Sequence, residues 1–331
     1  MNSKQIKVRA LGLCSGGLDS MLAGLILRKQ GVEVVWITFE TPFFSSLKAK
    51  KASETTSIPL IVQDITQDYL PILKNPPAGY GKWMNPCMDC HALMFRLAGK
   101  QLKDGKFHFL FSGEVLGQRP MSQTKSSLRY VEKNSGVEGY ILRPLSAKRL
   151  PETIPEKKRW VDREQLYDFA GRSRKPQIEL ARQFGITGYP SPAGGCLLTD
   201  KGYSKRLKDL LEHQETVQES ELHLLKYGRH FRLKNNTKVI VGRTKPDNQH
   251  IVKYYNPAAD TLIKVLRIPG PIILIPHGAA PSTIRWIASL CVGYSKTSNE
   301  TPVDVLVKSP EGKRIIKSSG ISPEQIRQWM I

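Results

Sequence analysis

Short apolar runs and stretches of helical periodicity alternate along the amino-terminal part of the chain. The apolar runs predict buried strands at 8–13, 32–39, 60–62, 107–111 and 140–145. Apolar side chains that recur every three or four positions predict helices between them, at 20–30, 45–57 and 91–102, and at 164–184 in two pieces broken near Pro176. Strands that alternate with helices predict an α/β fold built on a doubly wound parallel sheet, in which the strand ends form a ligand crevice.

The pattern changes beyond residue 200. A charged helix at 203–213 is followed by short runs that mix apolar with basic residues. These runs predict half-exposed strands at 250–255 and 261–265, and further strands are predicted at 238–243 and, buried, at 272–276, with a helix at 282–292. Together they predict a second, smaller α+β domain. We therefore expect one domain over residues 1–200, a helical connector over 201–225 and a small basic domain over 226–331.

Charge narrows the class of protein. The 331 residues include 50 Lys and Arg but only 29 Asp and Glu, which gives a net charge of +21 and a pI near 9.8. A basic excess of this size favours a polyanionic partner, and nucleic acid is the commonest one. The first residues are polar, and no apolar run is long enough to cross a bilayer, so we expect a cytoplasmic protein without membrane contact. Five cysteines argue against a disulfide framework.

The most informative stretch follows the first predicted strand and reads Cys14-Ser15-Gly16-Gly17-Leu18-Asp19-Ser20. A glycine-rich turn between a strand and a helix directs backbone N–H groups and a helix N-terminus at an anion. Positive φ angles at both glycines would let the backbone approach a phosphate closely. Both serine hydroxyls can donate hydrogen bonds, Asp19 can hold Mg²⁺, and Asp19 or Ser20 can cap the helix. Cys14, at the strand end, is expected to be packed in the core, like Cys291.

The string Ser15-Gly16-Gly17-Leu18-Asp19-Ser20 resembles the pyrophosphate loop of the ATP pyrophosphatase superfamily, which has an adenine nucleotide alpha hydrolase-like fold. That resemblance implies an enzyme that splits ATP into AMP and pyrophosphate and adenylates a carbonyl oxygen. The strand that ends at Phe39 would then receive the adenosine part of ATP. The motif itself does not identify the second substrate.

Two further stretches follow predicted strands and fall at the same sheet edge. Ser112, Gly113, Glu114 and Gln118 lie in the first, and Arg143 is a candidate phosphate ligand in the second. The string at 112–118, its continuation at 121–124 and the stretch at 140–145 resemble the 4-thiouridine synthetase branch of tRNA sulfurtransferases. The chain differs from that branch because neither an amino-terminal RNA-binding region nor a rhodanese tail is expected.

Three cysteines form a candidate metal site. Cys87 and Cys90 are two residues apart at the entry to a helix, and Cys196 follows two glycines in a proline-rich loop. Three thiolates with one open position can hold a 4Fe–4S cluster, or catalytic zinc with His91 or water as the fourth ligand. Soft sulfur ligands favour the cluster. The arrangement resembles the iron–sulfur-dependent tRNA thiolases.

Basic and aromatic residues are interleaved in the predicted second domain, as in proteins that contact the backbone and stack on the bases of nucleic acids. The stretch from 226 to 310 resembles the RNA-binding domain of NFACT proteins. The candidate RNA contacts are Arg229, Arg232, Lys238, Arg243, Lys245 and Lys253.

These resemblances lead to the hypothesis of an ATP-dependent tRNA sulfurtransferase, with ATP, Mg²⁺ and a 4Fe–4S cluster, in which sulfur replaces the adenylated oxygen of a uridine. Its expected partners are tRNA and a sulfur donor, either free sulfide or sulfide derived from a cysteine desulfurase. The sequence leaves open which uridine is modified and whether the protein forms a homodimer. One alternative is a queuosine-type ligase or amidotransferase with structural zinc. The other is a non-catalytic RNA-binding protein with a relic ATP site.

Overall fold

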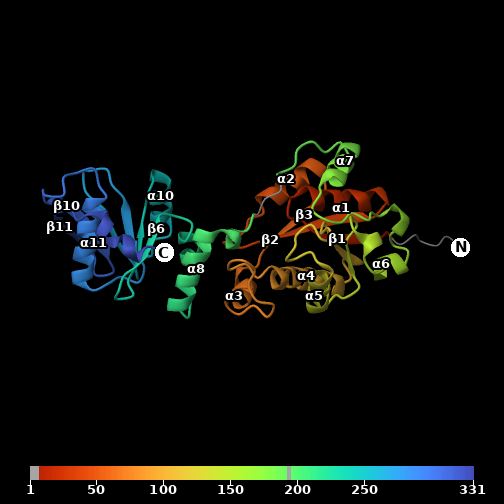
Figure 1. Cartoon of the computed structure of the whole chain (residues 1–331), viewed down its shortest axis with the longest axis horizontal. Helices are drawn as coiled ribbons and strands as arrows, with labels where there is room; N and C mark the ends of the chain where they lie inside the picture. Colours follow the sequence, from red (N-terminus) through yellow and green to blue (C-terminus); the bar gives the residue numbers. More distant parts are fainter. Residues whose placement is uncertain (1–6, 192–194) are drawn as a thin grey trace. The chain divides into compact units, whose positions relative to one another are not determined.

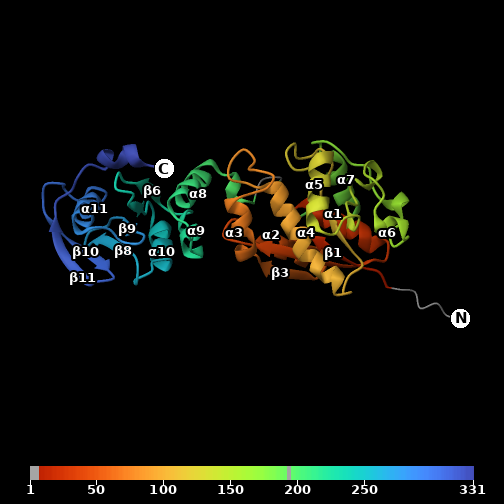
Figure 2. The ribbon, with the colours of Figure 1, turned by 90° about the horizontal axis from the view of Figure 1, so that it is seen from below.

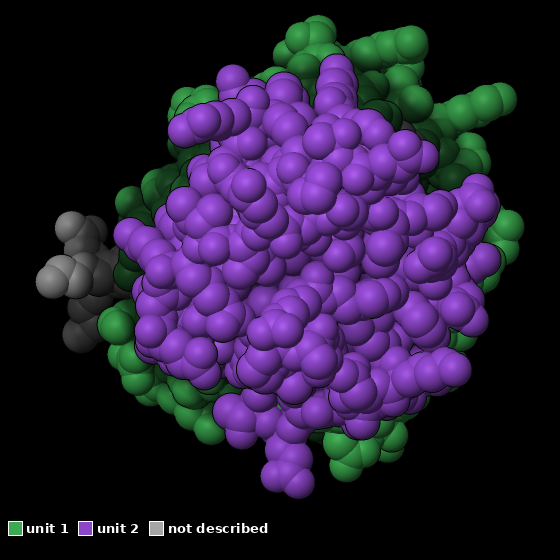
Figure 3. Space-filling model, turned by 90° about the vertical axis from the view of Figure 1, so that its left-hand side faces the viewer, with its two compact units in different colours: residues 1–199 green, residues 200–331 purple. Residues whose placement is uncertain are grey.

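The computed structural model describes residues 7–191 and 195–331. Residues 192–194, which belong to the predicted loop before Cys196, lie outside the described residues. So do residues 1–6, whose polar character was used to predict the cellular location. The chain divides into two compact units, residues 1–199 and 200–331 (Figure 3). Within the described ranges, no helix is both long enough and apolar enough to cross a membrane.

A parallel sheet forms the centre of the first unit. Its strand order is β3-β2-β1-β4-β5, and every neighbouring pair is parallel. The strands are β1 (Arg9–Leu13), β2 (Glu33–Glu40), β3 (Leu60–Asp64), β4 (Phe109–Ser112) and β5 (Ile141–Leu142). Because the order reverses at β1, the carboxyl ends of β1 and β4 lie side by side at a topological switch point, where ligands bind in such sheets. The predicted doubly wound α/β fold is therefore confirmed.

Helices cover both faces of this sheet. One face carries α1 (Leu18–Lys29), α2 (Leu47–Thr56) and α7 (Lys175–Gln183), as Figure 1 shows. The opposite face carries α3 (Thr66–Lys74), α4 (Cys87–Lys103) and α5 (Lys125–Ser135), which are seen best from below (Figure 2). The remaining short helices are α6 (Ile154–Lys157), η1 (Ala147–Arg149), η2 (Arg163–Gln165) and η3 (Leu197–Thr199).

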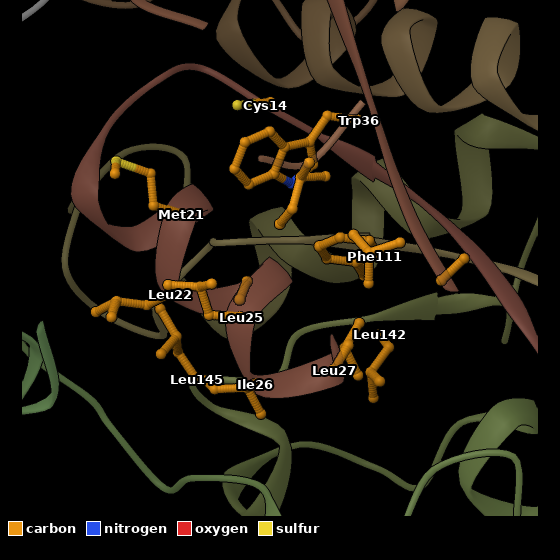
Figure 4. Packing of buried hydrophobic residues seen from close by; sticks show 14 of the residues in the cluster. Cys14, Met21, Leu22, Leu25, Ile26, Leu27, Trp36, Phe111, Leu142 and Leu145 are labelled. Carbon is orange, nitrogen blue, oxygen red and sulfur yellow. The ribbon is translucent and has the colours of Figure 1, made fainter. Parts of the chain in front are cut away.

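The core of the first unit packs α1 against the sheet. Met21, Leu22 and Leu25 of α1 share one cluster with Trp36 of β2, and Cys14 belongs to the same cluster (Figure 4). Cys14 is buried, and burial raises the pKa of its thiol to about 11. Cys291 is likewise buried in the second unit. Both cysteines are therefore core residues, as predicted, and their thiols stay neutral.

Two local predictions in the first unit are wrong. Neither Asp19 nor Ser20 caps α1, because the N-cap is Gly17 and no side chain bonds to the free N–H groups. Residues 166–171 are extended rather than helical: the Phe169 N–H donates to the Leu145 carbonyl, and Ala170 forms a parallel bridge with Leu116. These pairings provide hydrogen-bond partners for backbone groups of the segment, which therefore does not need to form a helix.

The helix after this segment, α7, begins at Lys175, so that Pro176 stands at its start and does not separate two helical pieces. Proline occupies the first turn of α7. Backbone N–H groups in the first turn make no hydrogen bond within the helix, so the absence of an N–H in proline costs nothing there. The helix α4 begins earlier than predicted, at Cys87, so that Cys87 and Cys90 share its first turn. The start of α7 contributes Gln177, which contacts Gln118 after β4. The early start of α4 places the Cys87 and Cys90 thiols on one helix.

The second unit contains a fully antiparallel sheet in the order β11-β10-β8-β9-β7-β6. Its strands are β6 (Arg229–Arg232), β7 (Lys238–Val241), β8 (Thr261–Val265), β9 (Ile272–Ile275), β10 (Val303–Ser309) and β11 (Gly312–Ser318). Its helices are α8 (Lys201–His213), α9 (Glu219–Leu224), α10 (Lys245–Lys253), α11 (Pro281–Gly293) and η4 (Pro323–Trp329). The unit is an α+β domain, as predicted, but β6, β10 and β11 were not predicted.

Alternation along the strands explains how this sheet buries both faces. On β9, Ile273 and Ile275 pack with α11, whereas Leu274 belongs to the cluster on the opposite face. That second cluster includes Leu224 of α9 and Ile251 of α10. Because successive side chains of a strand point to opposite faces, each central strand contributes to both cores.

The strand predicted at 250–255 is wrong, because these residues end the helix α10. Thr244 is its N-cap and accepts a hydrogen bond from the Asp247 N–H at 3.2 Å. Pro246 stands in the first turn, where proline is favoured. The alternation at 250–255 lies at the end of α10, several residues after these signals for the start of a helix.

Candidate functional site

The loop after β1 packs tightly against the backbone of α2. Gly16 has a φ of +72°, and a Cβ at this position would lie 2.2 Å from the Lys48 carbonyl carbon. Gly17, in contrast to the prediction, has an extended conformation with φ of −82°. The Ser20 hydroxyl donates to the Gly17 carbonyl at 2.8 Å, whereas Ser15 is exposed and accepts from the Gly17 N–H. Ser20 therefore supports the loop, and Ser15 presents its hydroxyl outward.

Asp19 lies where the ends of β1 and β4 meet. Its Oδ2 accepts a hydrogen bond from Gln118 Nε2 at 2.8 Å, while its Oδ1 is buried and has no hydrogen-bond partner within the described part of the chain. Burial raises the pKa of Asp19, against the opposing effects of Gln118, Arg174 and Arg119. A carboxylate oxygen that is buried but unpartnered is a suitable ligand for a hard cation such as Mg²⁺.

Gly113 makes this meeting of the strand ends possible. A Cβ on Gly113 would lie 2.4 Å from the Asp19 carbonyl carbon. Only glycine allows the backbone after β4 to approach the first turn of α1 so closely. The two motifs that the sequence placed at one sheet edge are therefore in direct backbone contact.

Glu114 is the centre of a buried ionic cluster. Its carboxylate accepts from Ser112 Oγ at 3.0 Å and from Arg143 Nε at 3.0 Å, and it pairs with His91 Nδ1 at 2.9 Å. Burial alone would raise its pKa, but Arg143 and His91 outweigh burial and lower the pKa of Glu114 to about 2. The cluster joins the end of β4 to α4 and β5. Glu114 therefore holds the site together rather than facing a ligand freely.

Arg143 is neither a surface residue nor an uncommitted phosphate ligand. Its side chain is only 4% exposed, and Nε is engaged by Glu114. Its Nη2 is buried, with no hydrogen-bond partner among the residues the structure describes. The guanidinium is thus held by one nitrogen and leaves another for a ligand.

The three predicted cysteines gather around Tyr69. Cys90 is buried, and the Tyr69 hydroxyl forms a hydrogen bond with its thiol. The Leu197 N–H, next to Cys196, donates to the Phe43 carbonyl at 2.9 Å, and the Phe43 ring lies 5.7 Å from that of Tyr69. These contacts bring a thiol from residue 196 to the first turn of α4.

Electrostatic coupling between the thiols supports this proximity. Burial raises the pKa of Cys90, and negative charge on Cys196 or Cys87 raises it further. Burial likewise raises the pKa of Cys196 to about 11, with a contribution from Cys87. In residues 7–191 and 195–331, however, no set of three or more His, Cys, Asp or Glu side chains is arranged as a metal site. The donor set, three thiols, fits a soft metal by its chemistry, and His91 is engaged with Glu114 through Nδ1.

Two buried residues at this site were not predicted from the sequence. Tyr69 contacts the Cys90 thiol, and Gln177 of α7 reaches Gln118. Each lies in an ordinary helical pattern without a local motif, so only the tertiary structure reveals it. Phe39, predicted at the adenosine subsite, is buried within β2, and its role in ATP binding stays a prediction.

The predicted RNA contacts in the second unit fall into two groups. Lys238 is buried, and both Lys238 and Arg232 pair with Asp209, at 2.5 and 2.8 Å. Burial lowers the pKa of Lys238 to about 8. These two ion pairs connect α8, which carries Asp209, to the strands β6 and β7. The Lys238 side chain is therefore buried and not available at the surface. The other four candidates are exposed: Arg229, Arg243, Lys245 and Lys253.

Stacked aromatic rings lie next to Lys253, one of these exposed residues. The His223 and Tyr254 rings stack with centroids 4.9 Å apart, and Tyr227 stacks on His250 at 4.1 Å. Lys253 Nζ lies over the Tyr254 ring at 5.4 Å. Basic groups and flat rings therefore share one part of the second unit, around α9 and α10.

Comparison with known proteins agrees with this division of the chain. Residues 5–154 match the family model described as thiamine biosynthesis protein (ThiI), and residues 228–330 match the model of the NFACT protein RNA binding domain. A tRNA sulfurtransferase of Desulfurococcus amylolyticus is 31% identical over 50% of this chain and 34% of its own length. A probable tRNA sulfurtransferase of Oceanobacillus iheyensis is 31% identical over 44% of this chain and 37% of its own length.

A solved 4-thiouridine synthetase in complex with RNA and ATP aligns with 54% of this chain and 52% of its own, at 21% identity and a TM-score of 0.35. The chain thus spans little more than a third of the length of the two curated relatives. The first matched region contains Asp19, Glu114 and Arg143 but not Cys196, and the second contains the four exposed basic residues. The first unit is therefore similar to the ThiI family over residues 5–154, and the second unit is similar to the NFACT RNA binding domain over residues 228–330.

Proposed function

We propose that the chain is an ATP-dependent tRNA sulfurtransferase that activates a uridine carbonyl oxygen by adenylation. The observation that carries this proposal is Asp19, whose free buried oxygen lies between the loop after β1 and the loop after β4. The family match of residues 5–154 and the names of the curated relatives support the substrate class.

The chain's own groups would bind and orient ATP. Backbone N–H groups at Ser15, Gly16 and the start of α1 would hold the β- and γ-phosphates, and Asp19 Oδ1 would hold Mg²⁺. The uridine oxygen attacks the α-phosphorus, and pyrophosphate leaves. A sulfur nucleophile then adds to the activated carbon, and AMP leaves with the original oxygen. Preorganised N–H groups and the cation stabilise the charge that develops on the phosphates.

We further propose that Cys87, Cys90 and Cys196 hold a 4Fe–4S cluster. The three-thiol donor set around Tyr69 supports this, since it contains neither carboxylate nor imidazole. A cluster with three protein ligands supplies one iron that is open to an external sulfur atom. Two of the thiols lie on α4, which also carries His91, the partner of Glu114, and this shared helix supports a cluster close to the proposed nucleotide site.

The second unit would bind the tRNA substrate. Its match to the NFACT RNA binding domain and the exposed side chains of Arg229, Arg243, Lys245 and Lys253 support this role. Lysine and arginine neutralise phosphates, and rings such as Tyr254 can contact bases. Such a protein would act in the cytoplasm, where its tRNA substrate is found.

A thiolation assay with purified protein and unmodified tRNA tests the function. Wild-type protein, Mg²⁺, ATP and sulfide should yield thiouridine and AMP, detected in nuclease digests by mass spectrometry. Cys196→Ala should lose thiouridine formation but retain ATP binding, whereas Cys291→Ala, far along the chain in the core of the second unit, should retain both. Wild-type protein that neither binds ATP nor exchanges pyrophosphate would refute the enzyme assignment.

Metal analysis tests the cysteine site separately. Protein purified without oxygen should contain about four irons and four sulfides per chain, and Cys87→Ala should lose them. Zinc in place of iron would contradict the cluster and leave the ATP chemistry standing.

A further inference from the structure

A chain of amide hydrogen bonds leads from α7 into the nucleotide site. Gln177 Nε2 donates to Gln118 Oε1 at 3.0 Å, and Gln118 Nε2 donates to Asp19 Oδ2 at 2.8 Å. Gln177 is fully buried, and its exposed fraction is 0%. The three residues come from three separate segments of the sequence, so that only the fold connects them.

The chemistry of these three side chains determines which group donates and which accepts in each of the two hydrogen bonds. An ionised carboxylate can only accept hydrogen bonds, so Asp19 requires the N–H end of the Gln118 amide. A side-chain amide can rotate by half a turn and present oxygen in place of nitrogen. Because Gln177 donates to the Gln118 oxygen, it opposes this rotation. Asp19 Oδ2 is then always occupied by a donor, and Oδ1 is the oxygen that remains without a partner in the described structure.

The backbone around Gln118 is fixed from the same side. The Gly171 N–H donates to the Leu116 carbonyl at 2.7 Å, and α7 packs against α1. Residue 177 lies outside the stretch 5–154 that matches the ThiI family model. The nucleotide site is therefore completed by a helix that the family match does not include.

We propose that Gln177 is a positioning residue of the nucleotide site: it orients the Gln118 amide so that Asp19 keeps one oxygen free for the Mg²⁺ of bound ATP. This inference rests on the proposed ATP-binding function. Gln177 touches neither ATP nor the cation and acts only through Gln118.

Two substitutions separate this role from simple packing. Gln177→Met keeps the length of the side chain and removes the donor, and it should weaken Mg²⁺-ATP binding about fivefold, the effect of one lost hydrogen bond. Gln177→Glu replaces the donor by an acceptor, which favours the rotated Gln118 amide, and should weaken binding by about 30-fold. Gln183→Glu places the same added charge on an exposed position of α7 and should change the Kd less than twofold.

The decisive measurement is the coupling between the two glutamines, with the Kd of Mg²⁺-ATP determined by calorimetry. In a Gln118→Ala background, Gln177→Met should have no further effect, because its only route to Asp19 is gone. Equal effects of Gln177→Met in both backgrounds would mean that Gln177 acts by packing, and would overturn the proposal. Unchanged binding in both Gln177 variants would also overturn it, with the ATP site intact. Absence of ATP binding by the wild-type protein would instead refute the proposed function, and this inference with it.

Discussion

The two units use charged residues in opposite ways. In the first unit, the charges predicted to act chemically gather at one sheet edge, where Glu114 is paired with Arg143 and Asp19 accepts a hydrogen bond from Gln118. In the second unit, the basic residues predicted to bind RNA are spread over several elements, and Arg232 and Lys238 are committed to Asp209. The spacing of a motif therefore predicts which residues the fold brings together, whereas an excess of one charge predicts only a surface of that sign.

The reason is that a motif encodes geometry and a net charge does not. The glycines and Asp19 have fixed positions relative to a strand and a helix, so the fold must present them together. The charge of +21 says nothing about which cations are paired with the 29 acidic residues. Four tests sharpen or break this contrast.

The largest effect is expected at the Glu114 cluster. Glu114→Ala leaves the Arg143 guanidinium buried without its carboxylate, and loss of one partner from a buried ion pair costs about 3–5 kcal/mol. Urea unfolding should show this loss for the first unit. The exposed pair of Arg129 and Glu138 provides the control, since Glu138→Ala should cost less than about 1 kcal/mol. Equal losses in the two variants would contradict the difference between buried and surface charge.

Asp19 should dominate the binding of Mg²⁺-ATP. Asp19→Asn keeps the shape of the side chain and removes its charge, and the Kd should rise roughly 100-fold, equivalent to about 2.7 kcal/mol. Asp68→Asn, on an exposed position of α3, is the matched control and should leave the Kd unchanged. Titration calorimetry measures both. An Asp19→Asn protein that binds Mg²⁺-ATP like the wild type would remove the observation on which the function is built.

Acid should affect the two units at different pH. His230 is buried, and burial lowers its pKa well below 6.5, so the folded second unit keeps it neutral while the unfolded chain takes up a proton. Stability of this unit is therefore lost as the pH falls below about 6.5, by at most about 1.4 kcal/mol per pH unit. The lowered pKa of Glu114 has the other consequence: its contribution to the first unit is complete above about pH 4.5 and is lost as the pH falls toward 2.

Urea titrations at pH 7.5 and 5.5 test this difference. The second unit should be weaker at pH 5.5, and His230→Gln should reduce the dependence, while the first unit should change little. A pH dependence that persists unchanged in His230→Gln would mean that another group is responsible.

The smallest effect is expected for single RNA contacts. Lys253→Ala should weaken tRNA binding roughly threefold and lower the slope of log K against log salt by about 1. Lys238→Met should leave the RNA affinity unchanged and lower only the stability, because its ammonium faces Asp209 inside the protein. Filter binding at several salt concentrations measures both variants. A loss of affinity in Lys238→Met that matches Lys253→Ala would break the division between paired and exposed cations.

Local patterns were sufficient for much of the first unit. The five parallel strands, the loop after β1 and the three cysteines follow from apolar periodicity and from motifs of fixed spacing. The failures have a common cause. Residues 166–171 and 250–255 satisfied a local pattern, but in the first case backbone pairing with Leu116 and Leu145, and in the second the Thr244 cap, decided the structure.

A loop with residues suited to binding phosphate, three candidate metal-ligating thiols and a large basic excess can be recognised in the amino-acid sequence without the fold. Which side chains contact one another depends on the tertiary structure. It brought Gln177 to Gln118 and Asp19, joined Glu114 to His91 and Arg143, and withdrew Lys238 from the surface. The physical reason is that hydrogen bonds and ion pairs between distant segments depend on distances of about 3 Å, and nothing in a local pattern specifies such a distance.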